Sequence, residues 1–133
     1  KFSSLSEATE IELEFDACPY YEPSSTGDMM APSNTDITEY FGVEVTGATI
    51  VGVTGETSAD AVISGDGATV TLRNVLVDKM IAEGLKDTYR YTTHKVKISG
   101  VTADTRIKIY SALENDGKNH RMWLDNLKVK KAN

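Results

Sequence analysis

Residues 119–131, NHRMWLDNLKVKK, decide the fold of this chain, because they form its clearest alternation of apolar and polar side chains. Before Asp125 the apolar residues fall on even positions, and after Asn126 they fall on odd positions. Successive side chains of a strand point to opposite faces, so one apolar face survives only if an extra residue is inserted between the halves. The sequence therefore predicts a final core strand with a β-bulge at Asp125 and Asn126. Leu124 and Leu127 should then lie on the same side of the sheet.

The composition is that of a soluble globular protein. The chain has 133 residues, of which 40% are hydrophobic and 26% are charged, and this length suits one domain with a two-layer core. The net charge of −6 argues against nucleic acid and anionic membranes as partners, since both attract a cationic surface. No apolar run reaches the roughly 18 residues that a membrane-spanning helix needs.

The first part of the chain predicts one strand followed by a long loop. Residues 10–16, EIELEFD, alternate strictly and predict an antiparallel strand with one face in solvent. Residues 17–39 contain all three prolines of the chain, and proline interrupts a strand ladder because it has no N–H donor. We expect this loop either to pack its own aromatic side chains over an open sheet edge or to contact a ligand.

The middle of the chain predicts short strands joined by glycine turns. Residues 40–45 and 48–53 are rich in β-forming side chains and are separated by a Thr-Gly turn, which predicts a tight hairpin. Residues 61–64 and 68–72 repeat the arrangement around the sequence GDG. Both pairs are expected to be strands that leave glycine turns.

Two later segments have a less regular pattern. Residues 74–86 predict a strand that ends near Val77 and then a short helical turn that ends at Gly84. Residues 89–99 change phase, which predicts a second bulge near His94.

Residues 105–112 alternate again and complete a set of eight or nine short strands without a sustained helix. This pattern predicts an all-β fold, an antiparallel β-sandwich that spans residues 1–133 as one domain with at most one short helix. A β-barrel is the alternative.

No motif for catalysis or metal binding is present. The two histidines, His94 and His120, have neither a metal-ligand spacing nor a position close to Cys18. A nucleophile elbow, a phosphate-binding glycine loop and a dinucleotide fingerprint are all absent from the sequence. We therefore expect no catalytic residue, no enzyme activity and no cofactor. The single cysteine cannot form an internal disulfide, and a buried, inert thiol is the expected state.

Calcium is the one metal for which oxygen ligands gather, at Asp60, Asp66 and residues 115–119. The order of these residues does not match an EF-hand loop, so turn chemistry is the expected role. A structural calcium ion is possible but has no support in the sequence.

Aromatic side chains supply the most plausible binding surface. Trp123 is the only tryptophan, and alternation places it on the polar face of its strand beside Arg121 and Asp125. Tyr110 is expected on the outer face of the preceding strand. Sugar rings present apolar C–H faces, so exposed aromatic rings flanked by polar groups suit carbohydrate. The alternative is that Trp123 covers a second hydrophobic layer under the long loop, while Asp125 and Asn126 satisfy the backbone of the bulge.

The run MWLDNLKV at residues 122–129 resembles the closing strand of jelly-roll, galactose-binding-like domains of secreted and surface-anchored proteins of gut bacteria. The preceding run IKIYS at residues 107–111 is also similar, and the resemblance covers about residues 89–131. It implies a non-catalytic, carbohydrate-binding-module-like β-sandwich, often an accessory to glycan-processing or adhesive proteins and frequently lipid-anchored. In that family the Asp-Asn pair belongs to the scaffold, so Asp125 and Asn126 support the fold more than the function.

We therefore expect a secreted or cell-surface module whose partners are carbohydrate and other domains or surface proteins. The chain begins at Lys1 rather than Met, and a signal or lipid-anchor segment is expected to have been removed. The residues expected to contact the ligand are Tyr20, Tyr21, Tyr110, Arg121 and Trp123. The competing hypothesis is a structural or adhesin-like protein-interaction module without a small-molecule ligand.

Overall fold

Alternating side chains produce strands along most of the chain that the computed structural model describes, which is residues 7–19, 40–73, 91–111 and 122–132. The elements are β1 (Thr9–Pro19), β2 (Tyr40–Thr46), β3 (Thr49–Thr54), the 3₁₀ turn η1 (Ser58–Asp60), β4 (Val62–Ile63), β5 (Thr69–Arg73), β6 (Thr92–Val101), β7 (Arg106–Tyr110) and β8 (Met122–Lys131). The all-β prediction is thus confirmed. The helical turn expected within residues 74–86 lies outside the described residues.

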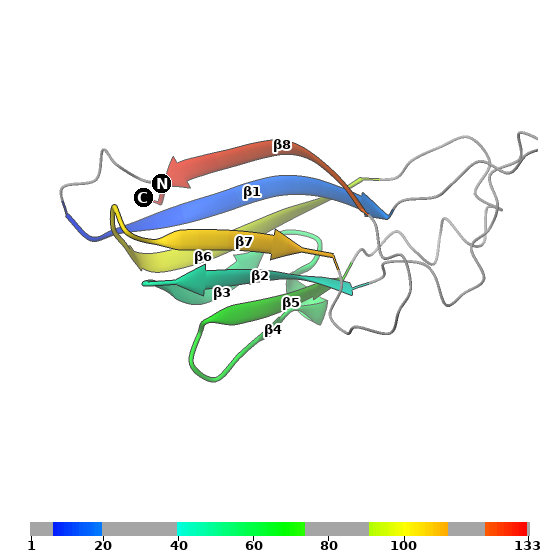
Figure 1. Cartoon of the computed structure of the whole chain (residues 1–133). Coiled ribbons are helices and arrows are strands. Elements are labelled where there is room, and N and C mark those ends of the chain that lie inside the picture. Colours follow the sequence, from blue (N-terminus) through cyan, green and yellow to red (C-terminus); the bar gives the residue numbers. More distant parts are fainter. Residues whose placement is uncertain (1–6, 20–39, 74–90, 112–121, 133) are drawn as a thin grey trace, which may run out of the picture.

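The strands form two four-stranded antiparallel sheets (Figure 1). The first sheet has the order β3-β6-β1-β8 and the second has the order β4-β5-β2-β7. The sheets face each other in a sandwich-like arrangement and do not close on themselves, so the barrel alternative is wrong. Strands β8 and β7 are the edge strands at one end of this arrangement, and β3 and β4 are the edge strands at the other.

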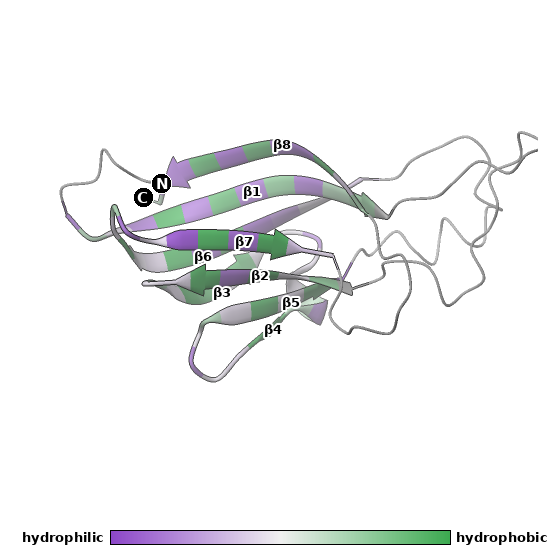
Figure 2. Ribbon diagram, viewed as in Figure 1, coloured by the Kyte–Doolittle hydropathy of each residue, from purple (hydrophilic) through white to green (hydrophobic). Residues whose placement is uncertain are grey.

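The core lies between the inner faces of the two sheets, because each strand presents its apolar residues to the other sheet. On β1 the odd-numbered side chains from Ile11 to Ala17 are buried and the even-numbered acids face outward. Figure 2 shows the resulting alternation of hydropathy along β1 and β8. The buried core cluster comprises Ile11, Leu13, Phe15, Ala17, Phe41, Val43, Val45, Ile50, Val70, Leu72, Val96, Ile98 and Val101.

The predicted bulge in the last strand is confirmed. The register between β1 and β8 shifts by one residue, so that Asn126 and Leu127 together face Phe15. Asn126 is the extra residue and has φ 51°, the one positive φ outside glycine in the described part of the chain. Asparagine enters the left-handed region more readily than most residues do, which explains its place at the bulge.

The bulge keeps the apolar side chains of β8 on the inner face. Leu124 lies opposite Ala17 and Val129 lies opposite Leu13, and both partners on β1 are buried. Directly opposed residues in antiparallel strands point to the same face. Leu127 shares this face because it lies between the bulge and Lys128, which points outward to Glu14. Leu124 and Leu127 therefore point to the same side of the sheet.

The hairpin predicted for residues 40–53 is wrong, although both of its strands exist. β2 pairs with β5 and β7, and β3 pairs with β6, so the chain crosses from one sheet to the other between them. The crossing is stabilised by Thr105 Oγ1, which donates to the carbonyl oxygen of Gly47 at 3.1 Å. Alternation identifies a strand but not its partner, and this explains the error. The second predicted hairpin is confirmed, because β4 pairs with β5.

The second bulge predicted near His94 is also wrong. The side chains at 92, 94, 96 and 98 are all buried in one unbroken alternation, and His94 lies directly opposite Phe15. The sequence pattern indicated that the polar residues Thr92 and His94 face outward, but both are buried in the core. The loop predicted from residue 17 also begins later, because β1 continues to Pro19.

Candidate functional site

The outer face of the first sheet carries an exposed aromatic pair. Trp123 on β8 lies opposite Cys18 on β1 and is 43% exposed. Tyr91 directly precedes β6 and is 40% exposed. The first residue of β6, Thr92, pairs with Ala17, and the same register continued by one residue would set Tyr91 beside Cys18. We call Tyr91, Cys18 and Trp123 the aromatic row.

The aromatic row spans two strand spacings, which places the backbones of Tyr91 and Trp123 roughly 10 Å apart. Cys18 lies between them and has no exposed surface. The prediction that the Cys18 thiol is buried and forms no disulfide is therefore confirmed. Tyr91 was not among the residues that the sequence pointed to, because its role depends on how β6 pairs with β1.

A network of hydrogen bonds joins three strands one row away from the aromatic row. Thr93 Oγ1 on β6 donates to Asp16 Oδ1 at 2.6 Å, and Asn126 Nδ2 on β8 donates to Asp16 Oδ2 at 2.8 Å. These two hydrogen bonds hold the pKa of the Asp16 carboxyl below its usual range, and the one from Thr93 has the larger effect. Asp16 is therefore an ionised acceptor with a fixed orientation. The backbone N–H of Asn126 donates to Asp125 Oδ1 at 2.7 Å, in agreement with the expected role of the Asp-Asn pair in the bulge.

Two rows of alternating charge continue along the same face. In each row a glutamate of β1 lies between a lysine of β6 and a lysine of β8. We call these six residues the lysine–glutamate ladder, and they are Lys95, Glu14 and Lys128 in the first row and Lys97, Glu12 and Lys130 in the second.

Glu14 is the most strongly paired acid of the lysine–glutamate ladder. It accepts hydrogen bonds from Lys130 Nζ at 3.0 Å and from Lys128 Nζ at 3.2 Å, and Lys95 Nζ lies 3.9 Å from Glu14 Oε2. The hydrogen bonds from Lys130 and Lys128 lower the pKa of the Glu14 carboxyl. Because the lysine side chains are exposed, the ladder orders the sheet surface more than it stabilises the fold.

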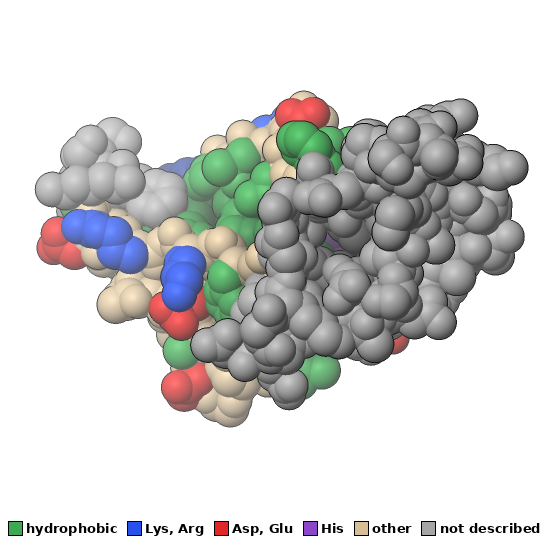
Figure 3. Space-filling view, turned by 45° about the vertical axis from the view of Figure 1, so that its right-hand side comes forward, with side chains coloured by type: hydrophobic (Ala, Val, Ile, Leu, Met, Phe, Trp, Pro, Cys, Tyr) green, Lys and Arg blue, Asp and Glu red, His purple; other side chains and the backbone are tan. Residues whose placement is uncertain are grey.

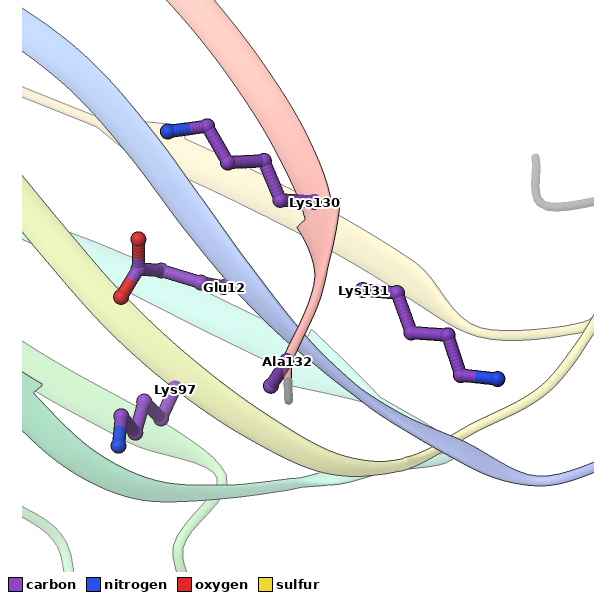
Figure 4. A pocket seen from close by; sticks show the side chains of 5 residues that line it. All are labelled: Glu12, Lys97, Lys130, Lys131 and Ala132. Atoms are coloured by element: carbon purple, nitrogen blue, oxygen red, sulfur yellow. The ribbon is translucent and has the colours of Figure 1, made fainter.

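A shallow hollow lies at the end of the ladder, with a volume of about 240 Å³ (Figure 4). Glu12, Lys97 and Lys130 point to the same side of the sheet, while Lys131 points to the opposite side. The hollow is open and polar, and its charged groups come from three neighbouring strands.

Tyr110 does not join the aromatic row. It lies on β7 in the second sheet, opposite Gly42, and its ring covers that glycine so closely that a Cβ there would overlap it. Lys108 Nζ lies 5.4 Å from the centre of the Tyr110 ring. Tyr110 faces the outer side of the second sheet and Trp123 the outer side of the first, so the structure separates these two predicted site residues. Tyr20, Tyr21 and Arg121 lie outside the described residues.

An apolar strip runs along the inner face of β8. Leu124, Leu127 and Val129 are 47%, 64% and 46% exposed, although they point to the same side as the buried residues of β1. We call these three residues the β8 strip. A hollow of about 350 Å³ lies beside the bulge and is lined by Phe15, Leu124, Asp125, Asn126 and Leu127.

His94 is the most perturbed titratable group in the described part of the chain. It is fully buried, hydrogen-bonds through Nδ1 to Thr57 Oγ1 at 3.1 Å, and stacks on Phe15 with 5.3 Å between ring centres. Burial lowers its pKa to about 4. The histidine is therefore neutral at pH 7 and acts as part of the core.

Within residues 7–19, 40–73, 91–111 and 122–132, no three His, Cys, Asp or Glu side chains are grouped as a metal site requires. Asp66, one of the calcium candidates, accepts hydrogen bonds from Ser64 Oγ at 2.7 Å and from the Ala68 N–H at 3.0 Å. These bonds belong to the β4–β5 turn, as turn chemistry predicted for this residue. The candidates at 115–119 lie outside the described residues.

The outer face of the first sheet thus combines two exposed aromatic rings, an oriented carboxylate and paired lysines. Such a surface can stack on an apolar ring face and exchange hydrogen bonds with hydroxyl groups. In the described part of the chain, no helix is long and apolar enough to cross a membrane. No protein-family model, curated protein or solved structure matches this chain.

Proposed function

We propose that this chain is a non-catalytic, glycan-binding module that binds carbohydrate on the outer face of its first sheet. The proposal includes the finer fold, a jelly-roll of the galactose-binding-like type, and a location outside the cell or at its surface. The aromatic row is the observation that carries it, because Tyr91 and Trp123 are both exposed and the strand register, continued by one residue, assigns them to one face. Side chains of this kind bury large areas against sugar rings.

The neighbouring polar groups support the same function. Asp16 is ionised and held by Thr93 and Asn126, so it offers carboxylate oxygens to sugar hydroxyls without rearrangement. Asp125 is exposed beside the bulge. Preorganised acceptors lower the entropic cost of binding. The proposed contact residues in the described part of the chain are therefore Tyr91, Trp123, Asp16 and Asp125.

Titration with a panel of neutral and acidic oligosaccharides tests the proposal. Trp123 is the only tryptophan of the chain, so its fluorescence reports directly on the aromatic row. We expect one class of oligosaccharide to shift the emission and to release heat in calorimetry. Trp123→Ala should weaken binding by roughly tenfold, as expected for the loss of one stacked aromatic ring.

Tyr110→Ala is the matched control, because Tyr110 lies on the outer face of the other sheet. It should leave the affinity unchanged, and Tyr91→Ala should reduce it. If no oligosaccharide binds, or if Tyr110→Ala and Trp123→Ala weaken binding equally, the aromatic row is not a glycan site.

A second function, protein interaction, is favoured by the exposed β8 strip. Large aliphatic side chains on the inner face of a sandwich are normally covered by the other sheet. The β8 strip lies on the inner face of β8, opposite to the face that carries Trp123.

A further inference from the structure

The first sheet projects beyond the second at one end. In Figure 1, β8 lies above β7 with β1 between them, so no strand of the second sheet faces β8 among the described residues. The consequence appears in the burial of the inner face: the β1 residues Leu13, Phe15 and Ala17 are 1–2% exposed, whereas the three residues of the β8 strip are about half exposed or more. Figure 3 shows hydrophobic side chains exposed in the upper part of the molecule.

β7 is the edge strand of the second sheet on this side, and no described strand pairs with its outer edge. It pairs only with β2 among the described strands. Its inner residues Ile107 and Ile109 are partly buried against the core. One more strand on the free edge of β7 would continue the second sheet opposite β8, and its inward side chains would cover the β8 strip.

The charge on β7 specifies the outward side chains of such a strand. Arg106 and Lys108 are both exposed on the outer face. On the β2 side Lys108 lies opposite Glu44, but Arg106 lies opposite Thr46 and has no acidic cross-strand partner there. Opposite charges on neighbouring strands attract, so acidic side chains suit the outward positions of the added strand.

We propose that the free edge of β7 binds an extended segment of another polypeptide in which aliphatic and acidic residues alternate. Its backbone pairs with β7, its aliphatic side chains cover the β8 strip, and its acidic side chains lie beside Arg106 and Lys108. The chain already contains a strand of this composition, because β1 alternates Ile11, Leu13 and Phe15 with acids. β1 pairs with β8, and two of its glutamates lie opposite lysines of β8.

The same charges disfavour a second copy of the chain as the occupant. Pairing β7 with β7 of another molecule would bring Arg106 and Lys108 close to their own counterparts, and like charges on neighbouring strands are destabilising. β8 carries Lys128 and Lys130 on its outer face and would meet the same repulsion. β3 has the sequence TIVGVT and offers no acid.

Binding of a labelled peptide to the full chain tests this proposal. The probe is the peptide TEIELEFDA, which copies residues 9–17, and the control probe replaces its four acidic residues with lysine. We expect the acidic probe to bind at least about tenfold more tightly than the lysine probe at low salt. Binding should also slow hydrogen exchange at alternate amides of β7.

Charge reversal distinguishes this site from nonspecific binding. The double variant Arg106→Glu, Lys108→Glu should lose the acidic probe and bind the lysine probe instead. Leu127→Lys should abolish binding of both probes, because it places a charge in the β8 strip. Val51→Lys is the matched control, because Val51 is similarly exposed at 50% but lies on the edge strand β3.

Three outcomes would overturn the proposal. Neither probe binds, or charge reversal leaves the preference unchanged, or the chain forms a dimer in sedimentation that Leu127→Lys dissociates while the probes do not bind. The last result would identify a second copy as the occupant. Because Trp123 lies on the opposite face of β8, glycan binding is expected to survive Leu127→Lys, and failure of one proposal therefore leaves the other intact.

Discussion

Asn126 shows how a single residue keeps β8 in the core. Its positive φ inserts the extra residue of the bulge, and its amide connects β8 to Asp16 on β1. The two contributions are separable, because glycine adopts a positive φ without strain but has no amide to donate.

Asn126→Gly should therefore lower the free energy of unfolding by about 0.5–1.5 kcal/mol, the usual net value of one hydrogen bond. Asn126→Ala should lower it by a further 1–2 kcal/mol or so, because alanine resists the left-handed conformation. Urea denaturation followed by circular dichroism measures both values. Equal stability of the two variants would mean that the backbone conformation of the bulge costs nothing.

His94 makes the stability of the fold depend on pH. Its pKa in the folded protein is about 4, below the value of about 6.5 in an unfolded chain. The unfolded state therefore binds the proton more readily, and stability falls as the pH decreases from about 6.5 towards 4. The loss amounts to about 3 kcal/mol, from 1.36 kcal/mol for each pH unit.

The carboxyl groups with lowered pKa titrate below this range. Asp16 and Asp66 have lowered values relative to 3.8, so the stability that they contribute is lost only below about pH 4. Unfolding by urea at several pH values should therefore have a slope between pH 6.5 and 4.5 that His94→Gln removes. A slope that persists in this variant would assign the effect to another group.

At the scale of elements, the β4–β5 turn is built to approach β3 closely. The carbonyl oxygen of Gly67 accepts a hydrogen bond from the Ile50 N–H at 2.8 Å, and Gly67 has φ 68°. A Cβ at this position would overlap the Thr49 side chain and lie 3.1 Å from the Ile50 carbonyl oxygen. This close approach connects the second sheet to the first where the chain crosses between them.

Gly67→Ala should lower the melting temperature more than Gly55→Ala does. Gly55 also has a positive φ of 89°, but nothing lies within 4 Å of an added Cβ, so its substitution costs only the backbone term of roughly 1–2 kcal/mol. Gly67→Ala adds the overlap with β3. Equal losses for the two variants would show that the turn relaxes away from β3 without cost.

The alternation of side chains predicted some strands well and others only in part. The alternation of β1, β5, β7 and β8 reports burial on one face, and these strands were predicted close to their observed bounds. A bulge was wrongly predicted in β6 because His94 is a core residue, which contacts Thr57 and two aromatic rings. A polar residue that finds partners in the core is not distinguishable from a surface residue by period alone.

For the whole molecule, the open end of the sandwich predicts an uneven distribution of stability. β1, β2, β5 and β6 have a neighbour on both sides, whereas β3, β4, β7 and β8 are edge strands. Among the described residues the outer edges of the latter have no neighbouring strand, and apart from Ile50 of β3, which donates to Gly67, their outer amides have fewer backbone partners. Local opening therefore requires less free energy at the edges than in the centre.

Native-state hydrogen exchange should show this order directly. Alternate amides of β7 and β8 are expected to exchange fastest among the strand amides, and those of β1 and β6 slowest. Slow exchange along the free edge of β7 in the isolated protein would mean that this edge is already covered. The apolar exposure of the β8 strip would then need another explanation.

The sequence alone determined the strands and one feature of their geometry, the bulge at Asn126, because side-chain period is a local property that burial of one face imposes on each strand. Only the tertiary structure decided which strands pair. That pairing placed Trp123 and Tyr110 on different sheets, set Tyr91 directly before β6 of the first sheet, and left the β8 strip without a facing strand among those described. These are relations between residues far apart in the chain, and they depend on the packing of all strands at once.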